Sequence, residues 1–128
     1  MRVAIAGWPR AGKSTLAERL GQEHGWPVYH ADDTIPLGRG PDAEEVARWL
    51  DRPGPWVVEG VAVARGLRAY RDRNPGKSPP IDRAILMLEA RPEFLPLLKG
   101  RLMLGKAHDT VWAQISPWLV GIPTERRS

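Results

Sequence analysis

The 128-residue sequence contains no cysteine, which excludes disulfide bonds and thiolate metal sites. It has only three histidines, and their scattered positions do not predict a zinc site. No apolar run approaches the ~18 residues of a membrane-spanning helix. The apolar stretch at Met1–Ala6 is too short for a signal peptide. These absences lead us to expect a cytoplasmic protein without a membrane partner.

The composition is that of a globular chain, with 42% hydrophobic and 27% charged residues. The length suffices for one hydrophobic core, so we expect a single domain over residues 1–128. The formal net charge is +4. Phosphate groups of a nucleotide or of a nucleic acid would suit this excess. Because the arginines form no dense basic block, we favour an arginine-rich surface as its explanation. The composition leaves the oligomeric state open.

The most informative motif is Gly7-Trp8-Pro9-Arg10-Ala11-Gly12-Lys13-Ser14, which matches the phosphate-binding loop pattern GxxxxGK[ST]. An apolar run, Met1–Ala6, precedes it and has the character of a buried parallel strand. Ser14–His24 follows with Leu16, Ala17 and Leu20 on one helical face. Strand, glycine loop and helix in this order are the context that the motif requires.

The chemistry expected of such a loop is the binding of a nucleoside triphosphate with Mg²⁺. Backbone N–H groups of the loop and of the helix N-terminus would hold the phosphates. Lys13 would reach the β- and γ-phosphate oxygens, and the Ser14 hydroxyl would ligate Mg²⁺. Trp8 is suited equally to stacking on a base and to packing against a helix. The predicted nucleotide-binding residues are Gly7, Trp8, Pro9, Arg10, Ala11, Gly12, Lys13, Ser14 and Thr15.

Strand and helix signals alternate along the chain, which predicts an α/β fold with three layers around a parallel sheet of four to five strands. The expected strands are residues 2–6, 27–30, 56–59, 83–88 and 120–124. The expected helices are residues 13–24, 42–50, 61–73, 92–103 and 110–119. Gly25 is predicted to cap the first helix, and Asp42 and Glu45 have the spacing of a capping box.

Acidic residues lie at or just after the ends of three of the predicted strands. Asp32 and Asp33 come just after the second strand, and in a parallel sheet such positions lie near the binding crevice. A positioned aspartate accepts the proton of a hydroxyl during phosphoryl transfer, although an Asp-Asp pair is also common in solvated turns. Glu59 and Glu89 each end a run of three apolar residues. We interpret His30 as a strand-end residue without a further role.

The phosphate loop, the Asp32-Asp33 pair and Glu59 together resemble the P-loop kinases, among them nucleotide kinases, shikimate kinase and the phage polynucleotide kinase. The chain also resembles short kinase-like P-loop proteins of tailed phages. The specific match covers residues 1–60, and Arg10 stands where many of these kinases have a second glycine. The resemblance implies a minimal version of the kinase fold, because the length leaves no room for a full substrate-binding insertion.

The resemblance also implies roles for the acidic residues. It favours Asp32 over Asp33 as the group that orients or deprotonates the acceptor. In these kinases the third strand lies beside the first, which places Glu59 near Ser14 and the metal. This implies a metal or substrate role for Glu59 and favours it over Glu89. Gly60 would allow a ligand to approach the backbone closely. Arg65 and Arg68 would face either substrate anions or solvent.

A second segment, Gly100–Ala107, fits GxxxxGK but ends in alanine and lacks the hydroxyl needed for Mg²⁺. We therefore reject it as a second phosphate loop. Its place in the chain resembles the basic lid of the kinases. Arg101 and Lys106 would then close over the transferred phosphoryl group as catalytic residues; a surface helix end is the alternative.

Three functions follow from these patterns. The first is an ATP- and Mg²⁺-dependent kinase that phosphorylates a small, nucleotide-like acceptor, with Lys13, Asp32, Arg101 and Lys106 as its catalytic residues. The second is a polynucleotide 5′-end kinase, whose acceptor is a nucleic acid. The third is a nucleotide-binding module with little or no turnover. A GTPase is not predicted, since no NKxD motif is present and Asn74–Lys77 forms a turn.

Overall fold

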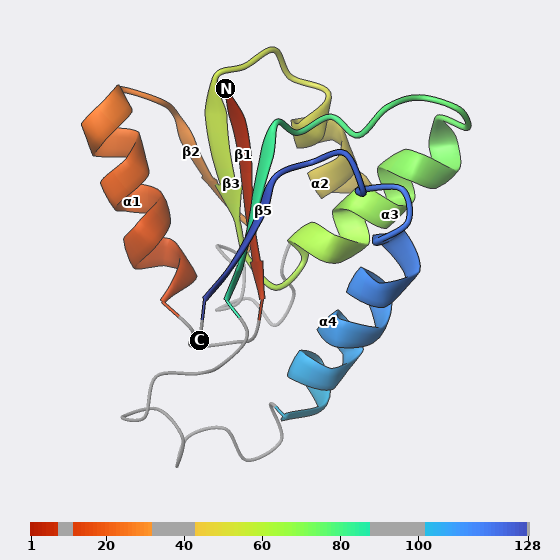
Figure 1. Ribbon diagram of the computed structural model, residues 1–128. Coiled ribbons are helices and arrows are strands. Elements are labelled where there is room, and N and C mark those ends of the chain that lie inside the picture. Colours follow the sequence, from red (N-terminus) through yellow and green to blue (C-terminus); the bar gives the residue numbers. More distant parts are fainter. Residues whose placement is uncertain (8–11, 32–42, 88–101, 128) are drawn as a thin grey trace.

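The computed structural model (Figure 1) describes residues 1–7, 12–31, 43–87 and 102–127, and for residues 102–107 it describes the backbone alone. Within these ranges strands and helices alternate along the chain. They are β1 (Arg2–Gly7), α1 (Lys13–His24), β2 (Val28–His30), α2 (Ala43–Leu50), β3 (Trp56–Glu59), α3 (Val63–Arg73), β4 (Arg83–Met87), α4 (Leu102–Ile115) and β5 (Thr124–Arg127).

The described strands form one sheet of five parallel strands in the order β2-β3-β1-β4-β5. The predicted parallel sheet is thus confirmed, and β1 lies between β3 and β4 as expected. Because every strand runs the same way, the carboxyl ends meet at one edge, from which α1 starts (Figure 1). At that edge the strands end in Gly7, His30, Glu59, Met87 and Arg127.

Helices cover both faces of this sheet, so the predicted three-layer arrangement is confirmed. In Figure 1, α1 lies on one face, whereas α2, α3 and α4 lie on the other. Successive side chains of a strand point to opposite faces, and β1 shows this clearly. Val3 and Ile5 pack with Leu16 of α1, whereas Ala4 and Ala6 belong to the larger core under the three other helices.

Burial on both faces explains why β1, β3 and β4 contain nearly continuous apolar runs, as the buried strands of a parallel sheet require. Five of the six residues of β1 are buried, and so are all four residues of β3. Glu59 is the exception in chemical character, since it is a carboxylate within a fully buried strand. The first helix ends as predicted, at a left-handed Gly25 with φ 71°.

The C-terminal elements differ from the sequence prediction. We expected separate helices at residues 92–103 and 110–119, but the backbone is one continuous helix from Leu102 to Ile115. A glycine inside a helix costs only about 1 kcal/mol relative to alanine, so Gly105 does not interrupt it. The helix ends two residues before Pro117, since a residue preceding proline disfavours the helical conformation. Residues 88–101 lie outside the described part.

The last strand also lies further along the chain than predicted. Residues 116–121 form turns after α4, and β5 begins at Thr124 rather than at residue 120. Pro123 therefore precedes the strand, and its carbonyl accepts a hydrogen bond from the Ala84 N–H at 3.0 Å. A proline placed just before an edge strand removes no donor from the ladder.

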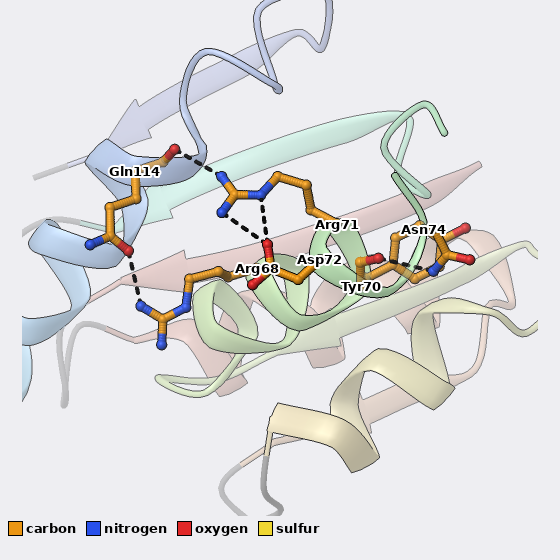
Figure 2. A network of polar contacts seen from close by, with 6 residues as sticks. All are labelled: Arg68, Tyr70, Arg71, Asp72, Asn74 and Gln114. Atoms are coloured by element: carbon orange, nitrogen blue, oxygen red, sulfur yellow. Dashed lines mark hydrogen bonds and ion pairs between the residues drawn. The ribbon is translucent and has the colours of Figure 1, made fainter. Parts of the chain in front are cut away.

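A polar network fixes α4 against α3 (Figure 2). The Arg68 guanidinium donates to Gln114 Oε1 at 2.9 Å, and Arg71 donates to the Gln114 carbonyl at 3.0 Å. Arg71 also pairs with Asp72 at 3.1 Å. Two arginines of one helix thus hold both the side chain and the backbone of a single residue on the other.

Candidate nucleotide-binding site

The phosphate-loop sequence lies between the central strand and a helix, as predicted. β1 ends at Gly7, and α1 begins at Lys13 after a left-handed Gly12 with φ 91°. The first turn of α1 contains no acidic residue, and the described side chains make no capping hydrogen bond to its N-terminus. Helix N-termini with free N–H groups attract anions. Residues 8–11, which include Trp8, Pro9, Arg10 and Ala11, lie outside the described part.

Gly7 has a steric role that the sequence motif does not reveal. Its backbone φ angle of 148° is one that residues with a Cβ atom rarely adopt. A Cβ built there would lie 2.0 Å from the Met87 carbonyl oxygen of β4. The close pairing of β1 with β4 therefore demands glycine at this position, whatever the loop binds.

Lys13 is only 4% exposed, which is unusual for a lysine. Its position at the start of α1, next to Gly12, is the one that the motif requires of the phosphate-binding lysine. Thr15, by contrast, is exposed on the first turn of the same helix. The predicted phosphate-binding residues that the structure describes therefore differ widely in burial.

Ser14 and Glu59 come together at the carboxyl edge of the sheet, as predicted. The Ser14 hydroxyl donates to Glu59 Oε1 at 3.0 Å across 45 residues of sequence. Glu59 is 1% exposed, and its second oxygen, Oε2, is buried without a hydrogen-bond partner in the described ranges. An unpartnered carboxylate oxygen in the interior is costly unless a cation or a donor satisfies it. This pair is therefore suited to holding a divalent cation.

His30 joins this pair, which the sequence analysis missed. Its Nδ1 lies 2.8 Å from Glu59 Oε1, and its Nε2 lies 2.6 Å from Glu18 Oε1. His30 does end β2, but its contact with Glu59 was not foreseen; it arises because β2 pairs with β3 in a register that sets His30 opposite Glu59. The available signal was that both predicted strands end at these residues. Glu18 follows Ser14 by one helical turn and so shares its face of α1.

The imidazole stands between the two carboxylates, so Glu18, His30 and Glu59 do not converge on one point. In the part of the chain that the structure describes, no group of three or more His, Asp or Glu side chains is arranged to hold a metal ion. A cation bound at Glu59 would therefore take its other ligands from the Ser14 hydroxyl, from phosphate oxygens and from water.

Gly60, predicted to admit a ligand, is in close contact with the chain itself. A Cβ built on Gly60, whose φ is 141°, would lie 2.5 Å from the Ala31 Cβ. Packing against Ala31 thus accounts for this glycine, and its role toward a substrate stays a prediction. The Ala31 N–H donates to the Glu59 carbonyl at 2.7 Å. The chain consequently passes beside Glu59 just before it reaches Asp32.

The remaining predicted residues are placed only in part. Asp32, Asp33 and Arg101 lie outside the described residues, and Glu89 does as well. The backbone of Lys106 belongs to α4. Arg65 is exposed on α3, as either of its two predicted roles allows. Arg68 is committed to Gln114 rather than open to an anion (Figure 2).

His108 is a second residue that the sequence analysis did not single out. It lies on α4, its side chain is fully buried, and its Nε2 has no hydrogen-bond partner among the residues described. Its Nδ1 lies 3.3 Å from Asp109 Oδ1, and its ring stacks on Trp112. Burial lowers the pKa of His108 below its usual value, the neighbouring charge of Lys13 lowers it further, and the Asp109 contact opposes the shift. The buried imidazole thus resists protonation, mainly because of its burial.

The described ranges contain no helix that is both long enough and apolar enough to span a bilayer. No protein-family model and no curated protein sequence matches the chain. Comparison with solved structures, in contrast, finds similar folds.

Shikimate kinase from Bacteroides thetaiotaomicron matches with a TM-score of 0.53 and 13% identity, over 98% of this chain and 84% of that one. The YorR protein of Bacillus subtilis, solved in complex with phosphorylated GDP, matches with a TM-score of 0.49 and 18% identity, over 99% and 85%. At such low identity the first match establishes the fold alone. The chain has the three-layer α/β fold of the P-loop kinases.

Proposed function

We propose that this protein is an ATP- and Mg²⁺-dependent kinase that transfers the γ-phosphoryl group to a small, nucleotide-like acceptor. The observation that carries this proposal is the contact of Ser14 Oγ with Glu59 Oε1 at 3.0 Å. It joins the hydroxyl of a phosphate-loop motif to a buried carboxylate on the neighbouring strand. A P-loop nucleotide site needs this pair of groups for its metal.

The chain's own residues would bind the triphosphate as follows. The N–H groups at the start of α1 hold the phosphates, and Lys13 places its cation against the β- and γ-phosphate oxygens. The Ser14 hydroxyl and Glu59 Oε2 fit a hard cation, because oxygen ligands are what Mg²⁺ prefers. When bound, Mg²⁺ neutralises charge on the transferring phosphoryl group.

Asp32 is the proposed acceptor-side residue. It follows Ala31, whose N–H is hydrogen-bonded to the Glu59 carbonyl, so the chain enters this segment at the carboxyl edge of the sheet. Its carboxylate would take the proton of the acceptor hydroxyl or orient it. Arg101 and Lys106 would complete the site as a basic lid that contacts the phosphoryl group in the closed state.

Titration calorimetry with MgATP tests the nucleotide site. Lys13→Ala should abolish most of the binding, because it removes the cation that contacts two phosphates. Lys77→Ala is the matched control, since Lys77 is an exposed lysine of the loop after α3. Equal MgATP affinity in wild type and Lys13→Ala would overturn the proposal.

Turnover needs a separate measurement, because a binding module would pass the calorimetric test. ADP release should rise when nucleosides or nucleoside monophosphates are added to the protein with MgATP. Stimulation only by single-stranded DNA with a 5′-hydroxyl would identify a polynucleotide kinase instead. Tight MgATP binding without stimulation by any acceptor would indicate a nucleotide-responsive module.

A further inference from the structure

The two oxygens of the Glu59 carboxylate have different surroundings. Oε1 lies 3.0 Å from Ser14 Oγ and 2.8 Å from His30 Nδ1, so it accepts from two elements at once. Oε2 is buried and makes no hydrogen bond with any residue that the structure describes. Because Oε1 has two hydrogen-bond partners and Oε2 has none among the described residues, the carboxylate is already oriented to bind one further ligand through Oε2.

His30 is itself held from the other side. Its Nε2 lies 2.6 Å from Glu18 Oε1, and Glu18 is on α1, one turn after Ser14. The two nitrogens of one imidazole ring thus each contact a carboxylate oxygen, one on α1 and one on β3. The chain Glu18–His30–Glu59 thereby ties α1 to β2 and β3 just where the phosphate-loop helix begins.

We propose that His30 is a positioning residue that, with Ser14, occupies Glu59 Oε1 and reserves Oε2 for the nucleotide's Mg²⁺. This inference rests on the proposed nucleotide site. Groups that hydrogen-bond a metal ligand fix its orientation, and their loss commonly costs about 10–100-fold in metal affinity. Without His30, the Glu59 side chain keeps only the Ser14 hydroxyl as a donor among its described contacts, and either oxygen can take it.

The experiment compares ATP affinity in saturating Mg²⁺ with ATP affinity in EDTA by calorimetry, and their ratio is the Mg²⁺ enhancement. His30→Leu and His30→Asn have the same branching, but only asparagine retains a polar group where Nδ1 stands. His30→Leu should lower the enhancement about tenfold, the effect of one lost hydrogen bond to a charged group. His30→Asn should restore most of it, and affinity in EDTA should be unchanged in both variants.

A second pair of variants, on α1, tests the positioning of His30 without a substitution in the sheet. Glu18→Ala removes the carboxylate that holds Nε2, whereas Glu23→Ala removes an exposed glutamate elsewhere on α1. We expect Glu18→Ala to reduce the enhancement by about threefold, in the range of a partly exposed ion pair, and Glu23→Ala to leave it unchanged. This pair decides the question if His30→Leu does not fold.

The outcomes distinguish failure of the proposed metal site from failure of the positioning role of His30. Wild-type protein with equal ATP affinity in Mg²⁺ and in EDTA would overturn the metal site, and this inference with it. A wild-type enhancement that persists in His30→Leu, or that falls equally in His30→Leu and His30→Asn, would overturn the positioning role alone. So would equal enhancement in Glu18→Ala and Glu23→Ala.

Discussion

Gly7 and Met87 pair at the carboxyl ends of β1 and β4 so closely that a Cβ on Gly7 would lie 2.0 Å from the Met87 carbonyl oxygen. Gly7→Ala should therefore force the two strands apart and, with its φ of 148°, strain the backbone as well. We expect a loss of several kcal/mol, on the order of the largest single-residue effects. Urea denaturation measures the change in unfolding free energy.

Two other glycines serve as controls for this prediction. Gly25→Ala meets no atom within 4 Å but keeps a φ of 71°, so it carries the conformational cost alone, about 1 kcal/mol. Gly121→Ala has neither problem and should leave stability unchanged. A Gly7→Ala variant no less stable than Gly25→Ala would show that β1 and β4 are not so closely paired.

Asp32→Asn should affect turnover more than ATP binding. The substitution keeps the shape of the side chain and removes its charge, and its proposed partner is the acceptor rather than ATP. We expect kcat to fall by roughly 10²–10⁴, the range for a lost acid or base. Steady-state kinetics beside calorimetry would show this, with Asp33→Asn as the matched variant. The opposite ranking of the two variants would assign the role to Asp33.

His108 should make the fold less stable at mildly acidic pH. Its pKa is lowered in the folded protein, so below the unfolded value of about 6.5 the unfolded chain binds a proton that the folded chain resists. The contribution of the neutral His108 to the unfolding free energy is therefore fully present above about pH 6.5. It decreases as the pH falls from there toward the pKa of His108 in the folded protein. The slope is at most about 1.4 kcal/mol per pH unit.

The measurement is the unfolding free energy at pH 7.5 and pH 5.5 in wild type and His108→Gln. Glutamine does not titrate, so the variant should lose less stability between the two pH values than wild type does. His24→Gln, at an exposed histidine of α1, should retain the wild-type difference. Identical pH dependence in wild type and His108→Gln would rule out this source of acid sensitivity.

Arg65 and Arg68 of α3 should differ in what their substitution changes. Arg68→Ala removes the hydrogen bond to Gln114 and should lower the unfolding free energy by about 1 kcal/mol without changing ATP affinity. Arg65→Ala, on the exposed side, should leave stability unchanged and raise KM for the acceptor if Arg65 contacts it. A loss of ATP affinity in Arg68→Ala would show that its pairing with Gln114 is not its main role.

Patterns of short range were sufficient to predict the fold. The motif at residues 7–14, the alternation of apolar runs and the order of elements predicted the sheet, whereas the resemblance to the P-loop kinases predicted the meeting of Ser14 with Glu59. His30 and Glu18 were missed because their contact depends on strand register and helix rotation, which no local pattern specifies. The bounds of α4 and β5 were wrong for a related reason, since glycine and proline shift element ends by amounts that depend on tertiary packing.

The central strand β1 contributes only small side chains to the larger core. Toward α2, α3 and α4, β1 contributes only Ala4 and Ala6, and bulky side chains of the helices, such as Leu67 and Trp112, fill that layer. The volume of this core is therefore specified mainly by the helices, while β1 supplies backbone pairing. The strand that ends in the phosphate loop can thus stay constant while the helical layer is repacked, provided that total volume and polarity pattern are kept. Apolar substitutions on the core-facing sides of these helices are thus to a large extent uncoupled from the backbone pairing of β1.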